Sequence, residues 1–305
     1  MSTPLVSVLV LSFNRPRQLA RCLDSLAAQT LERHRYEVVL VDVSQPANHG
    51  LVRARAQQLV LRHLVLPNRG VAVNRNAGAA AATAPLLAFL DDDCVARPEW
   101  LEGLLEAATA HPGALVGGDV VNLNPDNLVA DVGQLIHEAV DRHFNPAAAP
   151  ARFVPGLNFA VPRQGFLSLG GNDEGYGRLG AEDREFCRRW RAAGGRIVKA
   201  ADAVVAHDHR SEVGGFLRQS YGYGRGAWRY HAHGGGGGGG SAGQREEPLA
   251  GSHLALLGQL MQGLAKRPAR QRLGLALLLL GWELANTAGF LREAGGTVLA
   301  WRWRR

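Results

Sequence analysis

The first 120 residues alternate continuous apolar runs with segments whose apolar side chains recur every three to four positions. The runs predict buried strands at residues 5–12, 36–43, 63–66, 85–90 and 114–121. The periodic segments predict helices at residues 17–29, 52–61, 72–82 and 100–109. This β-α-β alternation predicts an α/β fold, a doubly wound and mostly parallel sheet with helices on both faces. Ligands of such sheets bind outside the carboxyl ends of the strands.

The remainder of the chain is less uniform. Residues 125–180 contain Pro, Asn and Gly clusters and look irregular, whereas a helix is expected at 180–193, a strand at 196–206 and a helix at 216–228. A run of seven glycines at 234–240 is typical of a flexible linker, and helices are expected at 253–264 and 272–291. We therefore expect an α/β domain over 1–230, a linker over 231–247 and a helical appendage over 248–305.

Charge and cysteine usage narrow the class of protein. The chain carries a net charge of +7, of which residues 262–305 supply +6, with eight basic side chains against two acidic ones. A basic segment beside apolar sequence favours an anionic membrane surface, and no nucleic-acid-binding motif accompanies it. The three cysteines form no disulfide or zinc pattern, which indicates a reducing compartment. Residues 1–14 lack a basic start and a cleavage site, so they are interpreted as a strand rather than a signal peptide.

The strongest chemical signal is Asp91-Asp92-Asp93 at the end of an apolar strand. Carboxylates at i and i+2 can project together, and oxygen ligands are those that Mg²⁺ and Mn²⁺ prefer. The alternative is a solvated acidic turn that caps the helix beginning near residue 98. This motif by itself leaves both interpretations open.

Two further motifs follow later in the chain. Glu182-Asp183 stands at the start of a predicted helix, where the helix dipole alone would favour acidic residues. His207-Asp208-His209 ends a predicted strand, and alternation would place the two histidines on one face. An exposed histidine pair without function is the alternative for the second motif.

Taken in order, these motifs resemble glycosyltransferase family 2, whose members have the GT-A fold. The similarity begins with VSVLVLSFNRP at 6–16 and continues with EVVLVD at 37–42 and NRGVAVNRNAG at 68–78. The Asp91–Asp93 motif, the Glu182-Asp183 pair and His207 then follow in the family's order over about residues 4–230.

The resemblance implies a donor half over about 1–122, which binds a nucleoside-diphosphate sugar. In that half Phe13 and Asn14 would line the nucleotide pocket, and Asp42 would bind the base or ribose. Arg75 would approach the diphosphate, with Asp92 also on the donor side. The family often has two aspartates after its second strand, whereas Val43 follows Asp42 here, which leaves the donor nucleotide open.

The resemblance also implies a metal site and an acceptor half over about 123–230. Asp91 and Asp93 would hold Mn²⁺ or Mg²⁺, and His207 occupies the position that completes the metal site in many members. Glu182-Asp183 would face the acceptor, with Asp183 as the general base.

The implied function is inverting transfer of a sugar to an acceptor hydroxyl on a glycan or lipid-linked acceptor, in cell-surface polysaccharide synthesis. A divalent ion and Arg75 would stabilise the leaving diphosphate. A sugar-phosphate nucleotidyltransferase is a second hypothesis, but residues 11–16 lack its glycine- and lysine-rich loop. A non-catalytic nucleotide-sugar binder is a third hypothesis, which the intact Asp91, Asp93 and Asp183 disfavour.

The C-terminal segment 273–291 is a 19-residue apolar stretch interrupted by Glu283 and Asn286. A central carboxylate is costly inside a bilayer, so a helix lying in the interface is favoured over a spanning helix. Packing on the α/β domain or a homodimer contact is the other alternative. We therefore expect a cytoplasmic enzyme attached peripherally to the inner face of the cell membrane.

Overall fold

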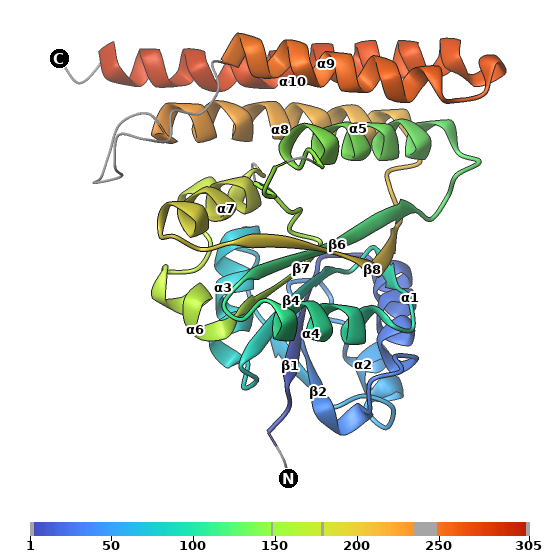
Figure 1. Cartoon of the computed structure of the whole chain (residues 1–305), viewed down its shortest axis with the longest axis vertical. Helices are drawn as coiled ribbons and strands as arrows, with labels where there is room; N and C mark the ends of the chain where they lie inside the picture. Colours follow the sequence, from blue (N-terminus) through green and yellow to red (C-terminus); the bar gives the residue numbers. More distant parts are fainter. Residues whose placement is uncertain (1–2, 148, 178–179, 235–248, 303–305) are drawn as a thin grey trace. The chain divides into compact units, whose positions relative to one another are not determined.

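The computed structural model describes residues 3–147, 149–177, 180–234 and 249–302 (Figure 1). The chain divides into two compact units. The first, here called the sheet unit, comprises Met1–Leu123, Pro150–Gly177 and Glu182–Asp208. The second, the helical unit, comprises Asn124–Ala149, Arg178–Ala181 and His209–Arg305.

The sheet unit is built on one eight-stranded sheet with the order β3-β2-β1-β4-β7-β6-β8-β5. The strands are β1 (Val6–Ser12), β2 (Tyr36–Asp42), β3 (Leu61–Val65), β4 (Leu86–Asp91), β5 (Cys94–Ala96), β6 (Leu115–Asn122), β7 (Asn158–Pro162) and β8 (Ile197–His207). Strands β3, β2, β1 and β4 are parallel, as are β6 and β8, whereas β7 and β5 pair antiparallel to their neighbours. The predicted α/β fold with a mostly parallel sheet is confirmed.

Alternating side chains of the buried strands form two separate cores, because successive residues of a strand point to opposite faces. Val8 and Val10 belong to the core with α1 (Pro16–Ala27) and α4 (Trp100–Ala110). Leu9 and Phe89 belong to the core with α3 (Val71–Ala81), α6 (Arg163–Ser168) and α7 (Glu182–Ala192). Helices therefore cover both faces of the sheet, as expected (Figure 1).

The helix predicted at 17–29 is confirmed as α1. Its apolar face, Leu19, Cys22, Leu23 and Leu26, is completely buried, and Pro16 opens the helix because its fixed φ suits the first helical turn. The next helix, α2 (His49–Arg55), is shorter than expected. Leu59 and Val60 therefore follow the helix, although the prediction placed them within it, and Leu59 is buried whereas Val60 is exposed.

The helical unit contains α5 (Leu128–Phe144), α8 (Val213–Gly234), α9 (Leu249–Ala265) and α10 (Ala269–Arg302). The expectation of irregular structure over 125–180 is wrong for α5. The polar cluster before it is its cap, since the Asn127 side chain accepts from the backbone N–H groups of Val129 and Ala130. Apolar side chains of α5, α8, α9 and α10 form a third core that includes Leu135, Phe216 and Trp282.

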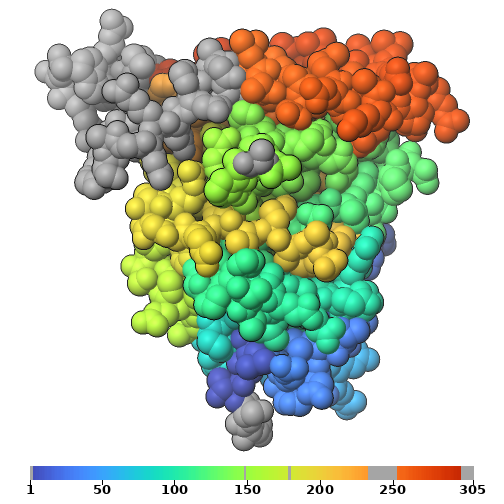
Figure 2. Space-filling view, viewed as in Figure 1, coloured from blue at the N-terminus to red at the C-terminus, as the bar shows by residue number. Residues whose placement is uncertain are grey.

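Helix α10 also presents apolar side chains outward. Its segment Ala269–Gly296 is long and apolar enough to cross a membrane, judged by length and composition alone. Figure 2 shows the surface of α9 and α10 in orange and red. The expected linker lies largely in residues 235–248, outside the described residues, so the boundaries at 231 and 247 stay a prediction.

Candidate active site

Parallel register brings the ends of β1, β2 and β4 to one edge of the sheet unit. Ser12 lies opposite Asp42, and Leu11 lies opposite Asp91. The turn after β1 holds Phe13 and Asn14 at the same edge. The polar residues that end these strands thus gather where ligands of doubly wound sheets bind.

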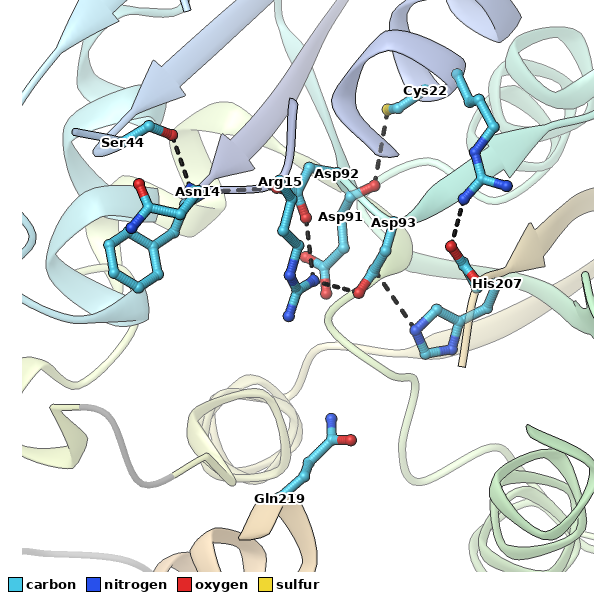
Figure 3. Close-up of polar contacts among 12 residues, drawn as sticks. Asn14, Arg15, Cys22, Ser44, Asp91, Asp92, Asp93, His207 and Gln219 are labelled. Atoms are coloured by element: carbon cyan, nitrogen blue, oxygen red, sulfur yellow. Dashed lines mark hydrogen bonds and ion pairs between the residues drawn. The ribbon is translucent and has the colours of Figure 1, made fainter. Parts of the chain in front are cut away.

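The three consecutive aspartates meet Arg15 at this edge (Figure 3). Arg15 NH1 lies 3.2 Å from Asp92 Oδ1 and also contacts Asp93 Oδ2. The backbone N–H of Phe13 donates to Asp92 Oδ2 at 3.4 Å. Burial and the neighbouring Asp93 raise the pKa of Asp92 to about 7, although Arg15 opposes the shift. The cluster therefore carries more negative charge than its own cations compensate.

Strand pairing places His207 beside this cluster. Strand β5 begins directly after Asp93 and pairs with β8, so that Cys94 lies opposite His207, and the Asp208 N–H donates to the Asp93 carbonyl. His207 Nε2 consequently lies 3.5 Å from Asp93 Oδ1. Burial lowers the pKa of His207, but the Asp93 carboxylate outweighs burial and raises it overall. Because β8 ends at His207, strand alternation does not extend to His209.

Arg75 links the aspartate cluster to the Glu182-Asp183 pair. It is buried in α3, and its guanidinium lies 2.6 Å from Asp91 Oδ1 and 3.2 Å from Glu182 Oε1. Gly156 makes room for it, since a Cβ at that position would lie 2.5 Å from Arg75 NH1. Burial lowers the pKa of Arg75, but Asp91 and Glu182 outweigh burial and raise it, so the side chain is a fixed cation.

The two acids at the start of α7 have different surroundings. Glu182 is buried, and burial together with Asp183 raises its pKa to about 7 against the effect of Arg75. Asp183 is only partly buried, and its carboxylate accepts from the N–H groups of Gly156 at 2.9 Å and Arg184 at 2.7 Å. These hydrogen bonds fix the orientation of the Asp183 carboxylate.

Asp42 organises the loop after β2. Its side chain is 0% exposed, and it accepts hydrogen bonds from Ser44 and Asn48 while lying 3.1 Å from His63 Nε2. Burial raises its pKa, but the Asn48 and Ser44 hydrogen bonds outweigh burial and lower it overall. The carboxylate thus faces its own loop, and its role toward a nucleotide stays a prediction.

Phe13 and Asn14 lie exposed in the turn after β1. Asn14 has a φ of 54°, a left-handed conformation that asparagine adopts more readily than most residues. Its N–H donates to Ser44 Oγ and its Oδ1 accepts from the Gln45 N–H, which ties the first two loops together. Both residues are accessible to a ligand at this edge.

The donor set suits a divalent cation of the Mn²⁺ or Mg²⁺ type. Ligand atoms of Asp93, Cys94 and His207 lie within 4.8 Å of one another. Asp91 ends strand β4, two residues before Asp93. Two carboxylates and an imidazole match the oxygen and nitrogen ligands of Mn²⁺. An added cation would also compensate the excess negative charge. The chemistry of the predicted set Asp91, Asp93 and His207 therefore fits the group.

Sequence reasoning missed three participants in this site. The sequence analysis includes Arg15 only within the motif 6–16 and predicts no role for it, yet it contacts two aspartates. Cys94 was counted as an isolated cysteine, and Asn48 was not considered. Only Arg15 could have been found from the sequence, because it stands beside Asn14, a predicted pocket residue. The contact of Cys94 depends on strand pairing, and that of Asn48 depends on the conformation of a loop.

Comparison with known proteins matches residues 7–152 to the model of glycosyl transferase family 2. The glucosyl-dolichyl phosphate glucuronosyltransferase of Haloferax volcanii is 30% identical over 228 residues, which cover 68% of this chain and 71% of that protein. The chain belongs to glycosyltransferase family 2. The validoxylamine A glucosyltransferase of Streptomyces hygroscopicus subsp. jinggangensis is 31% identical over 63% of this chain. This family member spans about half, 52%, of the length of that relative.

A solved structure extends the likeness to the fold. The mannosyltransferase PcManGT from Pyrobaculum calidifontis, in complex with GDP-Man and Mn²⁺, aligns with a TM-score of 0.65 at 19% identity. The alignment covers 98% of this family 2 chain and 88% of PcManGT. The expected GT-A fold and the expected enzyme class, a glycosyltransferase, are confirmed.

Proposed function

We propose that this chain transfers a sugar from a nucleoside-diphosphate sugar to an acceptor hydroxyl with inversion at the anomeric carbon. The observation that carries the proposal is the position of Arg75, whose guanidinium pairs with Asp91, next to Asp93, and with Glu182, next to Asp183. It joins a candidate metal site to a candidate base at one sheet edge. Relatives named as glucosyl- and glucuronosyltransferases, and a neighbour bound to GDP-Man and Mn²⁺, support it.

The donor side would stabilise the leaving group. Asp91, Asp93 and His207 would hold a divalent ion, which supplies a Lewis acid that neutralises charge on the departing diphosphate. Arg75 is held rigid by two carboxylates, so its positive charge is already in place when the leaving group develops charge. Asp92 anchors the turn that carries Phe13, which keeps the nucleotide side of the site in position.

The acceptor side would activate the nucleophile. A hydroxyl is weakly nucleophilic at neutral pH, so Asp183 would take its proton as the new bond forms. The acceptor oxygen bonds to the anomeric carbon, the bond from that carbon to the phosphate oxygen breaks, and the nucleoside diphosphate leaves. The hydrogen bonds from the N–H groups of Gly156 and Arg184 aim the carboxylate at one point, which favours attack from one face.

Matched substitutions at the acid pair test this assignment. Asp183→Asn should abolish transfer while donor affinity survives, because the lost interaction acts only in the transition state. Glu182→Gln keeps the size of a side chain that contacts Arg75, and it should reduce transfer less. If Glu182→Gln is inactive and Asp183→Asn retains near-normal transfer, the roles are reversed.

Product analysis separates transfer from the two alternative functions. Incubation of donor with Mn²⁺ should release free nucleoside diphosphate. Pyrophosphate as product would instead identify a nucleotidyltransferase, and no product would identify a binding protein. A thermal-shift screen of nucleotide sugars with Mn²⁺ identifies the donor, which the inward-facing Asp42 leaves open.

We also propose that the helical unit attaches the enzyme to an anionic membrane, where its acceptor is lipid-linked. The support is a stripe of exposed leucines on α10, at spacings of i, i+4, i+7, i+11 and i+18: Leu273, Leu277, Leu280, Leu284 and Leu291. Each is more than half exposed, and α9 adds Leu254 and Met261. Contiguous exposed apolar side chains of this kind mark interaction surfaces.

Charge distribution favours lipid over a protein partner for this leucine stripe. Exposed basic side chains, including Arg270 and Arg292, stand near its two ends, as lipid headgroups require. The central carboxylate that disfavoured a spanning helix is paired within the helical unit, since Glu283 Oε1 lies 3.1 Å from His253 Nε2 of α9. The buried free cysteines agree with a cytoplasmic location.

A flotation assay with anionic vesicles tests the attachment. Replacing Leu273, Leu277, Leu280 and Leu284 by Gln should abolish co-flotation, whereas replacing the exposed Val60, Val65 and Leu167 of the sheet unit should not. High salt should weaken binding only partly, because salt screens the arginines but not apolar burial. If neither protein floats and only the leucine variant loses a dimer in sedimentation, the stripe is a dimer contact.

A further inference from the structure

Arg15 occupies a fixed place in the candidate active site although the transfer chemistry assigns it no role. Asn14 before it is tied to the loop after β2, and Pro16 after it starts α1, so the backbone at Arg15 is held from both sides. Its side chain reaches Asp92 and Asp93, as Figure 3 shows. The side chain of Arg15 is 27% exposed, against 5% for Asp92 and 13% for Asp93.

Two cations, Arg75 and Arg15, pair with different members of the acidic cluster, and they differ in burial. Arg75 is buried and is held by Asp91 and Glu182 together. Arg15 is partly exposed and compensates Asp92 and Asp93. Like charges this close stay ionised only with a nearby opposite charge, so Arg15 stabilises the Asp93 carboxylate in this state. Arg15 therefore pairs with a carboxylate that the candidate metal site also uses.

We propose that Arg15 is a displaceable counter-ion, which releases Asp93 when a divalent cation binds and then turns its guanidinium to the donor diphosphate. The proposal rests on the proposed function, because that function supplies both the cation and the diphosphate. A divalent cation on Asp93 would stand within a few ångströms of the Arg15 guanidinium, and the repulsion favours departure. Partial exposure leaves the side chain room to move, and a guanidinium matches the bidentate geometry of phosphate oxygens.

The exchange couples the two ligands. A cation that binds alone displaces Arg15 from its carboxylates and gives it no new partner. A cation that binds with a nucleoside diphosphate replaces the lost ion pairs by contacts with phosphate. Each ligand therefore strengthens the other, and the coupling must be equal in both directions. Arg15 is a positioning residue in this scheme, and its effect is measurable without any sugar transfer.

Calorimetry on the full chain tests the exchange with Mn²⁺, and separately with GDP and UDP at saturating Mn²⁺. Arg15→Gln should bind Mn²⁺ alone about tenfold more tightly than wild type, because the competing cation is gone. The same variant should bind the better of the two nucleotides about tenfold more weakly. Opposite signs distinguish exchange from structural damage, which would weaken both. Arg55→Gln, which removes a surface ion pair with Asp24 in the same unit, should change neither affinity.

Three outcomes would overturn the proposal. Unchanged or weaker Mn²⁺ binding by Arg15→Gln shows that Arg15 does not compete, and it leaves metal-dependent transfer intact. Unchanged nucleotide affinity shows that Arg15 does not reach the diphosphate. Failure of wild type to bind Mn²⁺ in either titration would overturn the metal-dependent function and the exchange together. If Arg15→Gln lowers the melting temperature strongly, Arg15→Lys replaces it, with the same signs and smaller changes expected.

Discussion

The leucines of α1 in the sheet unit are fully buried, whereas five leucines of α10 in the helical unit are more than half exposed. Both helices are rich in leucine, and residue type alone does not separate the two uses. In α1 the apolar face lies against a sheet that is itself apolar on that side. In α10 one face joins the third core and another apolar face remains outward. The difference shows that an apolar stripe in the sequence predicts a contact surface but does not identify what binds to it.

The two units also differ in how their carboxylates are buried and paired. In the sheet unit, two buried carboxylates each have an acidic neighbour: Asp92 is next to Asp93, and Glu182 is next to Asp183. Burial, together with this neighbour, raises the pKa of Asp92 and of Glu182 to about 7. In the helical unit Glu293 is partly exposed and paired, since its Oε2 lies 2.9 Å from Arg225 Nε. Concentrated charge at the sheet edge is destabilising until a ligand arrives, whereas separated pairs serve stability alone.

The largest effect is expected at the charged edge of the sheet unit. Asp93→Asn should lower kcat/KM by on the order of 10³-fold, because it removes a ligand of an ion whose charge stabilisation contributes several kcal/mol. Nucleoside diphosphate affinity should also lose its dependence on Mn²⁺. Asp24→Asn, at an exposed ion pair of the same unit, is the control. A wild-type nucleoside diphosphate affinity that stays unchanged across a Mn²⁺ titration would contradict the assignment.

Truncating one leucine in each unit tests directly whether the leucines of α1 and α10 contribute differently to stability. Leu19→Ala should lower the free energy of unfolding by about 2–5 kcal/mol, since Leu19 is completely buried. Leu277→Ala should change it by less than about 0.5 kcal/mol, because the side chain is 62% exposed. Denaturant titration measures both values. An equal loss for the two variants would indicate that the outward stripe of α10 is covered within the protein.

Two glycines of α8 sharpen the comparison within the helical unit. A Cβ at Gly224 would lie 1.9 Å from the backbone oxygen of Asn286 in α10, whereas a Cβ at Gly222 would meet nothing within 4 Å. Gly224→Ala should therefore cost roughly 1–3 kcal/mol through overpacking. Gly222→Ala should stabilise by about 0.5–1 kcal/mol, because alanine favours a helix. Thermal unfolding of both variants tests whether α8 and α10 pack as closely as described.

The smallest effect concerns the pH dependence of stability. The folded-state pKa of Glu182, about 7, exceeds its ordinary value near 4.5, so the folded state binds more protons between these values. Stability from this group is present at low pH and is lost as pH rises toward 7. The free energy of unfolding of wild type should fall relative to that of Glu182→Gln between about pH 5 and pH 8, by at most about 3 kcal/mol. Denaturant titrations of both proteins across this pH range measure the difference. A constant difference across this range would contradict the pKa shift.

Much of the sheet unit was predictable from local pattern. Continuous β-branched runs such as 6–12 can satisfy burial on both faces only as inner strands, and they do so as β1. The prediction of irregular structure over 125–180 is wrong for α5, because Asn127, which the pattern assigns to a loop, caps that helix. The short strands β5 and β7 escaped prediction because three to five residues carry too little periodicity.

The amino-acid sequence by itself determined the family, the α/β alternation and the order of acidic motifs along the chain, because these depend on residue type and spacing. Only the tertiary structure decided which of those motifs meet. Register between β5 and β8 places His207 beside Asp93, and Arg75 reaches from α3 to two acids far away in sequence. The same holds for the inward-facing Asp42 and for Arg15. Such contacts depend on strand pairing and helix packing across 16 to 114 residues of chain, which no local pattern encodes.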